Sequence, residues 1–210
     1  EDWHKGVIGI VASRLIESYY RPTLVFTKSG EKLAASARSV KGFDVYEALE
    51  QCSEHLEQFG GHKYAAGLTL SPDQYIPFKE KFEAVVKKTI DKELLIPEIA
   101  IDSPLELSDI TPKFFRILKQ MGPFGPKNMK PVFTTNAVRD NGYGKRVGAD
   151  KSHLKLNIIN GADQKTYNAI GFGLGDKITS TQNDFDIAYN LDENEWNGNT
   201  SIQLLLKDIK

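Results

Sequence analysis

The feature that most constrains this sequence is the segment 59–67, which reads Phe-Gly-Gly-His-Lys-Tyr-Ala-Ala-Gly. We expect it to lie between a helix and a strand. Glycines allow the backbone to approach a bound group closely and leave N–H donors that can point at oxygen atoms. Next to them, His62 and Lys63 add side-chain donors. The segment therefore predicts an anion-binding site formed by Gly60, Gly61, His62 and Lys63.

Length and composition indicate a protein with two small domains. The chain has 210 residues, of which 40% are hydrophobic and 26% are charged, so each half can bury a core. No stretch approaches the roughly 18 apolar residues that span a bilayer, and the first residues lack a signal-peptide pattern. The single cysteine, Cys52, cannot form an internal disulfide. We therefore expect a cytoplasmic protein without a membrane partner. Because the chain starts at Glu1 rather than at a methionine, we also expect further residues to precede it.

The first half, residues 1–95, predicts an α/β domain. Apolar spacing, turn residues and capping residues give alternating helices and strands, which pack most simply as an α/β sandwich. A capping pair, Asp44 with Glu47, opens the second helix. The expected elements are a helix over 7–20, strands over 23–27 and 33–37, a helix from 44 to 59, a strand over 65–70 and a helix that starts at Ser71-Pro72.

The second half, residues 96–210, predicts a mostly β domain, with the boundary between residues 93 and 98. Its one expected helix begins at Thr111-Pro112 and ends near Met121. Five or six short strands with one helix fit a small barrel, and we favour an OB-fold, which commonly binds single-stranded nucleic acid. The expected strands are 98–102, 131–139, 153–159, 166–172, 184–191 and 201–208, separated by turns such as Asn141-Gly142 and Asn197-Gly198.

Charge is strongly segregated along the chain although its net value is only −1. Between Lys113 and Lys155 ten Lys or Arg residues accompany two Asp residues, a net +8, and aromatic residues lie among them. Cations for phosphates and rings for base stacking are what single strands require, and a solvated surface over core aromatics is the alternative. The residues expected to line a nucleic-acid groove are Lys127, Lys130, Arg139, Lys145, Arg146 and Lys155.

A second candidate phosphate site is the segment Ser36-Ala37-Arg38-Ser39. The guanidinium of Arg38 can hold a phosphate through two parallel hydrogen bonds, and Ser36 and Ser39 add hydroxyl groups. The alternative is the exposed end of a strand. For His4 a binding role competes with a structural one, in which it caps the following helix or packs beside Trp3.

No catalytic or metal-binding cluster is predicted within this chain. Hydrolysis of a phosphodiester usually needs metal-bound water, and therefore clustered Asp and His ligands. The four histidines lie at positions 4, 55, 62 and 153, and no Asp-His-His run occurs. We therefore expect the chain to bind its substrate without cleaving it.

Several blocks, in this order, resemble the RecJ family of single-strand-specific exonucleases. The segment 59–67 is similar to the GGHxxAAG signature of the DHHA1 domain, and residues 3–14, 36–39 and 121–133 are similar to further RecJ blocks. Within the last of these, Pro126 and Met129 replace the more usual Gly and Pro.

The resemblance implies a DHHA1 substrate-binding domain in residues 1–95 and an OB-fold in 96–210. It implies the recognition part of a 5′ to 3′ exonuclease for single-stranded DNA in repair and recombination, with Ser36, Arg38, Ser39, His62 and the neighbouring donors at the 5′ phosphate or adjacent backbone. Mn²⁺ or Mg²⁺ would be held by a DHH domain that this chain lacks. Single-stranded DNA and a single-strand-binding protein are the expected partners.

Two other functions remain open from the sequence. A DHHA1 phosphodiesterase for nanoRNA or cyclic dinucleotides would share the first domain, but such proteins usually end after it. A non-enzymatic single-strand-binding protein would explain the second domain and leave segments 36–39 and 59–67 without a role.

Overall fold

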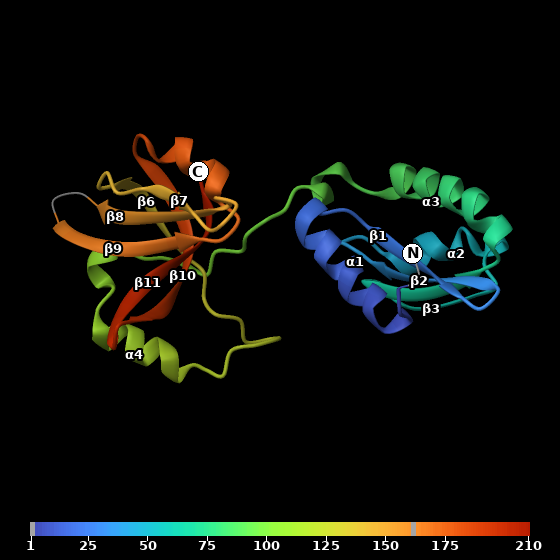
Figure 1. Cartoon of the computed structure of the whole chain (residues 1–210), viewed down its shortest axis with the longest axis horizontal. Coiled ribbons are helices and arrows are strands. Elements are labelled where there is room, and N and C mark those ends of the chain that lie inside the picture. The colour runs from blue at the N-terminus through green and yellow to red at the C-terminus, as the bar shows by residue number, and fades with distance from the viewer. Residues whose placement is uncertain (1–2, 161–162) are drawn as a thin grey trace. The chain divides into compact units, whose positions relative to one another are not determined.

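The computed structural model describes residues 3–160 and 163–210. The chain divides into two compact units, Glu1–Glu98 and Ile99–Lys210, each of which is treated by itself below (Figure 1). A division near residue 95 is what the change in sequence texture predicts.

Unit 1 is a four-stranded antiparallel sheet of order β1-β2-β4-β3. The described part of the unit contains no helix that is both long and apolar enough to cross a membrane, and neither does that of unit 2. The strands of unit 1 are β1 (Thr23–Ser29), β2 (Lys32–Arg38), β3 (Gln58–His62) and β4 (Ala65–Leu70). The α-helices of unit 1 are α1 (Lys5–Tyr19), α2 (Val45–Glu50) and α3 (Tyr75–Thr89).

The core of unit 1 lies on the sheet face that α2 and α3 cover. Along β4 the residues alternate, so that Ala66, Leu68 and Leu70 are buried while Gly67 is exposed. These side chains pack with Phe78 of α3 and with apolar residues of α2 in one buried cluster. The opposite face carries α1, which contacts β1 and β2. The alternation of side chains in a strand therefore separates a packed face from one that is only half covered.

The expected helix over 44–59 is wrong in its second half. Asp44 caps α2 as predicted, and its carboxylate accepts from the N–H groups of Tyr46 and Glu47. The helix ends at Glu50, and a short 3₁₀ turn (Ser53–His55) follows. Residues 58–62 instead form β3, because pairing with β4 along its whole length outweighs the local helical pattern.

The described residues of unit 2 form the seven remaining strands and one α-helix, α4 (Pro112–Gln120), whose cap is Thr111 as predicted. The sheet order is β5-β6-β10-β11-β9-β8-β7, and β6 also pairs with β8. The pairings thus lead from β6 through β10, β11, β9 and β8 back to β6. The strands are β5 (Ser103–Pro104), β6 (Phe133–Asp140), β7 (Lys145–Val147), β8 (His153–Asn160), β9 (Asp163–Gly171), β10 (Phe185–Trp196) and β11 (Asn199–Ile209).

The inner side of this sheet forms the second core. In β8 the buried residues Leu154, Leu156 and Ile158 alternate with more exposed ones, as expected for a half-buried strand. The predicted turn Asn197-Gly198 joins β10 to β11, with φ values of 50° and 77° that suit a two-residue hairpin. The expected strand over 98–102 is wrong. β5 is only two residues long and starts at Ser103. The N–H of the preceding residue, Asp102, donates to the carbonyl of Val132.

Candidate nucleic-acid interface

Two predicted segments of unit 1 meet in neighbouring rows of one sheet. Arg38 of β2 pairs with Ala65 of β4, which pairs with His62 of β3. Two residues further along the strands, Ser36 pairs with Gly67, which pairs with Gly60. Directly paired residues, and residues two apart on a strand, share one face of a sheet. The side chains of Ser36, Arg38 and His62 therefore lie on the same face, with Ala65 between Arg38 and His62 and with Gly67 and Gly60 beside Ser36.

Helix α1 covers only part of this face. A Cβ atom at Gly9 of α1 would lie 2.8 Å from Nη2 of Arg38, so the glycine makes room for the guanidinium. Nη1 of Arg38 donates to Oγ of Ser36 at 2.9 Å and to the carbonyl of Ala37 at 2.8 Å. These contacts hold Arg38 half-buried at the edge of α1, with guanidinium donors still available for a ligand.

The uncovered part of the face is a surface of small residues, which we call the glycine floor: Gly60, Ala65 and Gly67. Gly60 and Gly67 are exposed. A Cβ atom at Gly60 would have no neighbour within 4 Å, and one at Gly67 would have its nearest neighbour at 3.8 Å. Space above a backbone without side chains is what the close approach of a ligand requires.

Gly61 has a structural role in the sheet, and its part in binding an anion stays a prediction. Its φ is +149°, and an added Cβ would lie 2.3 Å from the carbonyl oxygen of Ala65 and 2.5 Å from Cα of Ala66. The absence of a side chain therefore permits the close pairing of β3 with β4. Both glycines are exposed, but an added Cβ would meet no neighbour at Gly60 and would collide with β4 at Gly61.

His62 and Lys63 follow at the end of β3. The Nδ1 atom of His62 accepts from the N–H of Tyr64 at 3.3 Å, so in the neutral ring Nε2 carries the proton and is the donor. Lys63 lies in the turn to β4, where its carbonyl accepts from Val45. Its ammonium group is 5.8 Å from the ring centre of Tyr64. Both side chains are exposed.

Two predicted binding residues have local structural partners. The hydroxyl of Ser39 donates to the carbonyl of Phe43 at 2.9 Å, which holds the loop after β2. His4 caps α1, with its Nδ1 accepting from the N–H of Gly6 at 3.0 Å. The capping alternative for His4 is confirmed, and a contact with a ligand stays a prediction for both residues.

Metal ligands do not gather in the part of the chain that the structure describes. There, no three His, Cys, Asp or Glu residues are placed so that they could hold an ion. The described residues therefore do not fit a catalytic metal centre, and no hydrolytic step is assigned to them.

In unit 2 two of the six predicted groove lysines and arginines lie side by side. Lys145 of β7 is directly opposite Lys155 of β8, and both are exposed on the outer side of the sheet. Neither has an ion-pair partner among the described residues. Like charges at directly opposite positions repel each other. An anion bound between them would remove that repulsion.

Both arginines of the predicted groove, and also Lys130, form ion pairs with acidic residues that come later in the sequence. Arg146 is 3.4 Å from Asp176, and Nη2 of Arg139 donates to Asp184 at 3.0 Å. The hydrogen bond from Arg139 lowers the pKa of the Asp184 carboxyl below its usual value. The excess of positive charge in residues 113–155 is therefore partly neutralised in the folded unit, which the sequence count does not reveal.

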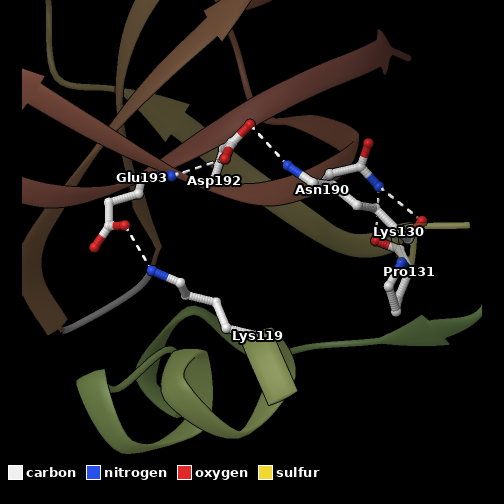
Figure 2. A network of polar contacts seen from close by, with 6 residues as sticks. All are labelled: Lys119, Lys130, Pro131, Asn190, Asp192 and Glu193. Atoms are coloured by element: carbon white, nitrogen blue, oxygen red, sulfur yellow. Dashed lines mark hydrogen bonds and ion pairs between the residues drawn. The ribbon is translucent and has the colours of Figure 1, made fainter. Parts of the chain in front are cut away.

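Lys130 belongs to a polar network that fastens the loop before β6 onto β10 (Figure 2). Its ammonium group is 3.0 Å from Asp192, while the amide of Asn190 donates to the carbonyls of Lys130 and Pro131 at 3.2 and 2.7 Å. In the same network, Lys119 of α4 bonds to Glu193 at 2.7 Å. Figure 2 shows these side chains converging on one stretch of β10.

The structure brings only some of the predicted groove residues close together, and a groove that includes all six stays a prediction. Lys130 is tied to Asp192 and Arg139 to Asp184, which are eight positions apart along or just before β10. In an extended strand this corresponds to roughly 25 Å. Lys127 lies in the same loop as Lys130. Lys145 and Lys155 are the pair that the fold brings together.

The aromatic residues within the basic stretch 113–155 are only partly exposed. Phe115 and Phe133 are buried in the core, whereas Tyr143 is 71% exposed. Phe172, just after β9, is 63% exposed, and its ring centre is 5.1 Å from that of His153. Sequence reasoning missed Phe172 because it lies outside the basic stretch. The alternation of the preceding strand, in which Tyr167 and Ala169 are buried, could have placed it outside.

Unit 2 also has a pocket of about 740 Å³ between α4 and β11. Arg116, Lys119 and Lys165 line it, and none of the predicted groove residues does. Lys119 is already paired with Glu193, and Lys165 donates to the carbonyl of Ile110 at 3.1 Å.

Comparison with known proteins gives a family match in each half of the chain. Residues 1–88 match the DHHA1 domain, and residues 101–208 match the RecJ OB domain. The single-stranded-DNA-specific exonuclease RecJ of Bacillus subtilis is 35% identical over 211 residues, and that of Escherichia coli is 31% identical over 217 residues. A crystal structure of RecJ from Thermus thermophilus in complex with Mg²⁺ matches with a TM-score of 0.80 at 28% identity.

These relatives are much longer than the region they share with this chain. The alignments cover 98% and 99% of the chain, but only 26% of the Bacillus protein and 37% of the Escherichia protein. The Thermus structure covers the whole chain, which corresponds to 31% of its own length.

Proposed function

Because this chain belongs to the RecJ family, whose OB domain matches more than half of it, we propose that it is the substrate-recognition part of an exonuclease. The enzyme would degrade single-stranded DNA from 5′ to 3′ in DNA repair and recombination. The relatives with the same two domains are named single-stranded-DNA-specific exonucleases. Catalytic residues and their Mn²⁺ or Mg²⁺ would lie outside the described residues.

We propose that unit 1 holds the 5′ end of the strand. The observation that carries this proposal is the shared face of Ser36, Arg38 and His62 around the glycine floor. A guanidinium and an imidazole N–H can both donate to phosphate oxygens, and the glycines allow the sugar-phosphate backbone to lie close to the sheet. Lys63, beside His62, adds a positive charge at the rim.

Unit 2 would bind the strand further from its end. We infer a small closed barrel from the pairing of β6 with both β10 and β8, which supports the OB-fold assignment. In such a barrel the second and third strands, here β8 and β9, and the loop after the first strand form the usual face for oligonucleotides. Lys145 and Lys155 would lie on this face with Tyr143 and Phe172, and together they would supply the cations and rings that single strands require.

The remaining groove residues and partners stay proposals. Lys127, Lys130, Arg139 and Arg146 would add weaker contacts along the path of the strand, because the last three already have acidic partners. A single-strand-binding protein is a further proposed partner.

The proposal is tested by the binding of single-stranded oligonucleotides that differ only in a 5′ phosphate or a 5′ hydroxyl. Replacing Arg38 with Ala should reduce the preference for the phosphorylated strand by about tenfold or more, since a charge-assisted hydrogen bond contributes roughly 1.5 to 3 kcal/mol. Arg38→Lys keeps the charge and loses the two-pronged geometry, so it should recover only part of the preference. The matched control is Arg14→Ala, because Arg14 is an exposed residue of α1 that pairs with Glu17.

Circular dichroism would verify that the three variants are folded. Equal losses on both oligonucleotides for Arg38→Ala would assign Arg38 to the strand backbone and not to its end. Absence of any binding by the parent chain would refute the proposed function.

A further inference from the structure

An acidic residue organises the loop of unit 2 that leads into Lys145. Asp140, the last residue of β6, accepts three backbone hydrogen bonds through its carboxylate. Oδ2 accepts from the N–H groups of Gly142 at 2.9 Å and Gly144 at 2.7 Å, and Oδ1 accepts from Asn157 of β8 at 2.8 Å. One side chain thus joins the end of β6, the following loop and the neighbouring strand.

The loop is built around this carboxylate. Gly142 has a φ of +93°, which glycine adopts without strain. A Cβ atom at Gly144 would lie 2.9 Å from Oδ2 of Asp140 and 2.9 Å from Cδ2 of Leu156, so the chain passes directly over the carboxylate. Tyr143 lies between the two glycines whose amides are bonded, and its side chain is exposed.

The same segment continues into the lysine pair. Lys145 directly follows Gly144 and is opposite Lys155. Fixing the amides of residues 142 and 144 therefore fixes where β7 begins, and with it the place of the Lys145 side chain. A loop that is ordered before binding loses less conformational entropy when it binds.

We propose that Asp140 is a positioning residue for nucleic acid, which holds Tyr143 and Lys145 in the arrangement that receives a single strand. This rests on the proposed function of unit 2. Asp140 does not contact the strand itself in this proposal, because its oxygen atoms are occupied by the three N–H groups.

The proposal predicts an effect of opposite sign from simple electrostatics. Removing a negative charge near a phosphate-binding surface should strengthen binding if charge alone matters. If Asp140 positions the loop, its removal should weaken binding although the surface becomes more positive. Asp140→Asn keeps the shape of the side chain, but one of its two terminal atoms becomes an N–H donor. At least one of the three backbone N–H groups is then left without its acceptor.

The experiment compares the affinity of Asp140→Asn and of Asp150→Asn for a single-stranded oligonucleotide at fixed salt. Asp150 lies in the same basic stretch and accepts from only one backbone N–H, that of Ser152 at 3.1 Å. Both substitutions remove one negative charge. We expect about five- to tenfold weaker binding for Asp140→Asn, the scale of the net contribution of one ordinary hydrogen bond, and unchanged or tighter binding for Asp150→Asn.

Amide hydrogen exchange gives a readout that does not depend on binding. The amides of Gly142 and Gly144 should exchange faster in Asp140→Asn, whereas most of the amides of unit 2 should keep their protection. If Asp140→Asn does not fold, Gly144→Ala serves instead, because its Cβ displaces the carboxylate without changing any charge. Its expected result is likewise severalfold weaker binding.

The outcomes separate this inference from the function on which it rests. Parent chain that binds no single strand refutes the function of unit 2. A parent that binds, with Asp140→Asn or Gly144→Ala of equal or higher affinity, overturns the positioning role alone.

Discussion

The two units place their candidate binding residues in different ways. In unit 1 the residues come from two short segments that pair through β4, and the candidate side chains of Ser36, Arg38 and His62 share one face. In unit 2 the candidates are spread from Lys127 to Lys155, and several of them are paired with acids. A compact site suits one chemical group at the end of a strand, while a broad surface suits a repeating backbone.

The difference shows which kind of sequence pattern predicts how residues are placed in the folded protein. The unit 1 motifs lie in strands, where the alternation of side chains and the register of pairing determine which residues share a face. A sum of charges has no such geometric constraint, because the partners of a lysine or arginine can come from any part of the chain. In unit 2, Asp176, Asp184 and Asp192 supply them.

The strongest test of the unit 1 site separates its two adjacent glycines. Gly61→Ala should lower the free energy of unfolding by roughly 2 to 4 kcal/mol, because the new Cβ would lie 2.3 Å from the backbone of β4. Gly60→Ala should change the free energy of unfolding by no more than about 1 kcal/mol, since the new Cβ would have no neighbour within 4 Å. Denaturant unfolding monitored by circular dichroism measures both.

The glycine variant that changes stability least, Gly60→Ala, should change affinity most. Under conditions where both are folded, Gly60→Ala should weaken the binding of a 5′-phosphorylated strand, because its methyl group occupies the glycine floor. If Gly60→Ala binds like the parent chain, the ligand does not lie on this floor, and the comparison between a compact and a broad site fails.

For unit 2 the corresponding test is charge reversal at two pairs of lysines. Lys145→Glu with Lys155→Glu should reduce the dependence of log affinity on log salt by about 0.7 for each phosphate that the lysines no longer neutralise. The matched pair, Lys127→Glu with Lys130→Glu, should reduce it less, because Lys130 is already neutralised by Asp192. Titrations at several salt concentrations give both slopes. A larger change for the second pair would move the path of the strand to the loop before β6.

A smaller effect is expected from the exposed ring of Phe172. Phe172→Ala should weaken single-strand binding by about 1 kcal/mol or somewhat more, the scale of stacking on one base. Because the side chain is 63% exposed, stability should change little. Met129→Ala is the control, as Met129 is 73% exposed on the loop before β6. Similar affinities for the two variants would exclude stacking on Phe172.

Much of unit 1 could be predicted because its signals are local. Apolar spacing predicts α1, and the position of Arg38 next to Ser36 and Ser39 identifies the end of β2. The helix expected over 44–59 is too long because pairing of residues 58–62 with β4 is a contact that no local pattern contains. The same pairing explains Gly61, whose need for glycine depends on the backbone of Ala65.

In unit 2 the strands are easier to predict than the site. Turn residues such as Asn197-Gly198 separate alternating segments, and the hairpin they predict is present. The roles of Phe172 and Asp140 depend on the side of the sheet that they face and on amides that fold back toward them. Ion pairs such as that of Arg139 with Asp184 join residues 45 positions apart, which a count of charges along a segment cannot anticipate.

The smallest effect concerns the loop that carries Lys127. This residue has a φ of 70°, the third position of a tight turn in which Gly125 and Asn128 exchange backbone hydrogen bonds of 2.8 and 2.9 Å. Glycine is favoured at that position, since a side chain there is strained by about 1 kcal/mol. Lys127→Gly should therefore raise the free energy of unfolding by up to that amount, less the extra entropy of glycine in the unfolded chain.

Thermal unfolding of Lys127→Gly and of Lys127→Ala measures this strain directly, because both substitutions remove the same charge. Lys127→Gly should unfold at a temperature a few degrees higher than Lys127→Ala, as roughly 1 kcal/mol corresponds to about 4 °C in a domain of this size. Equal transitions would mean that the strain at residue 127 does not exceed the extra entropy of glycine in the unfolded chain. A gain for Lys127→Gly together with parental affinity for single strands would place this loop outside the interface and leave Lys145 and Lys155 as its principal cations.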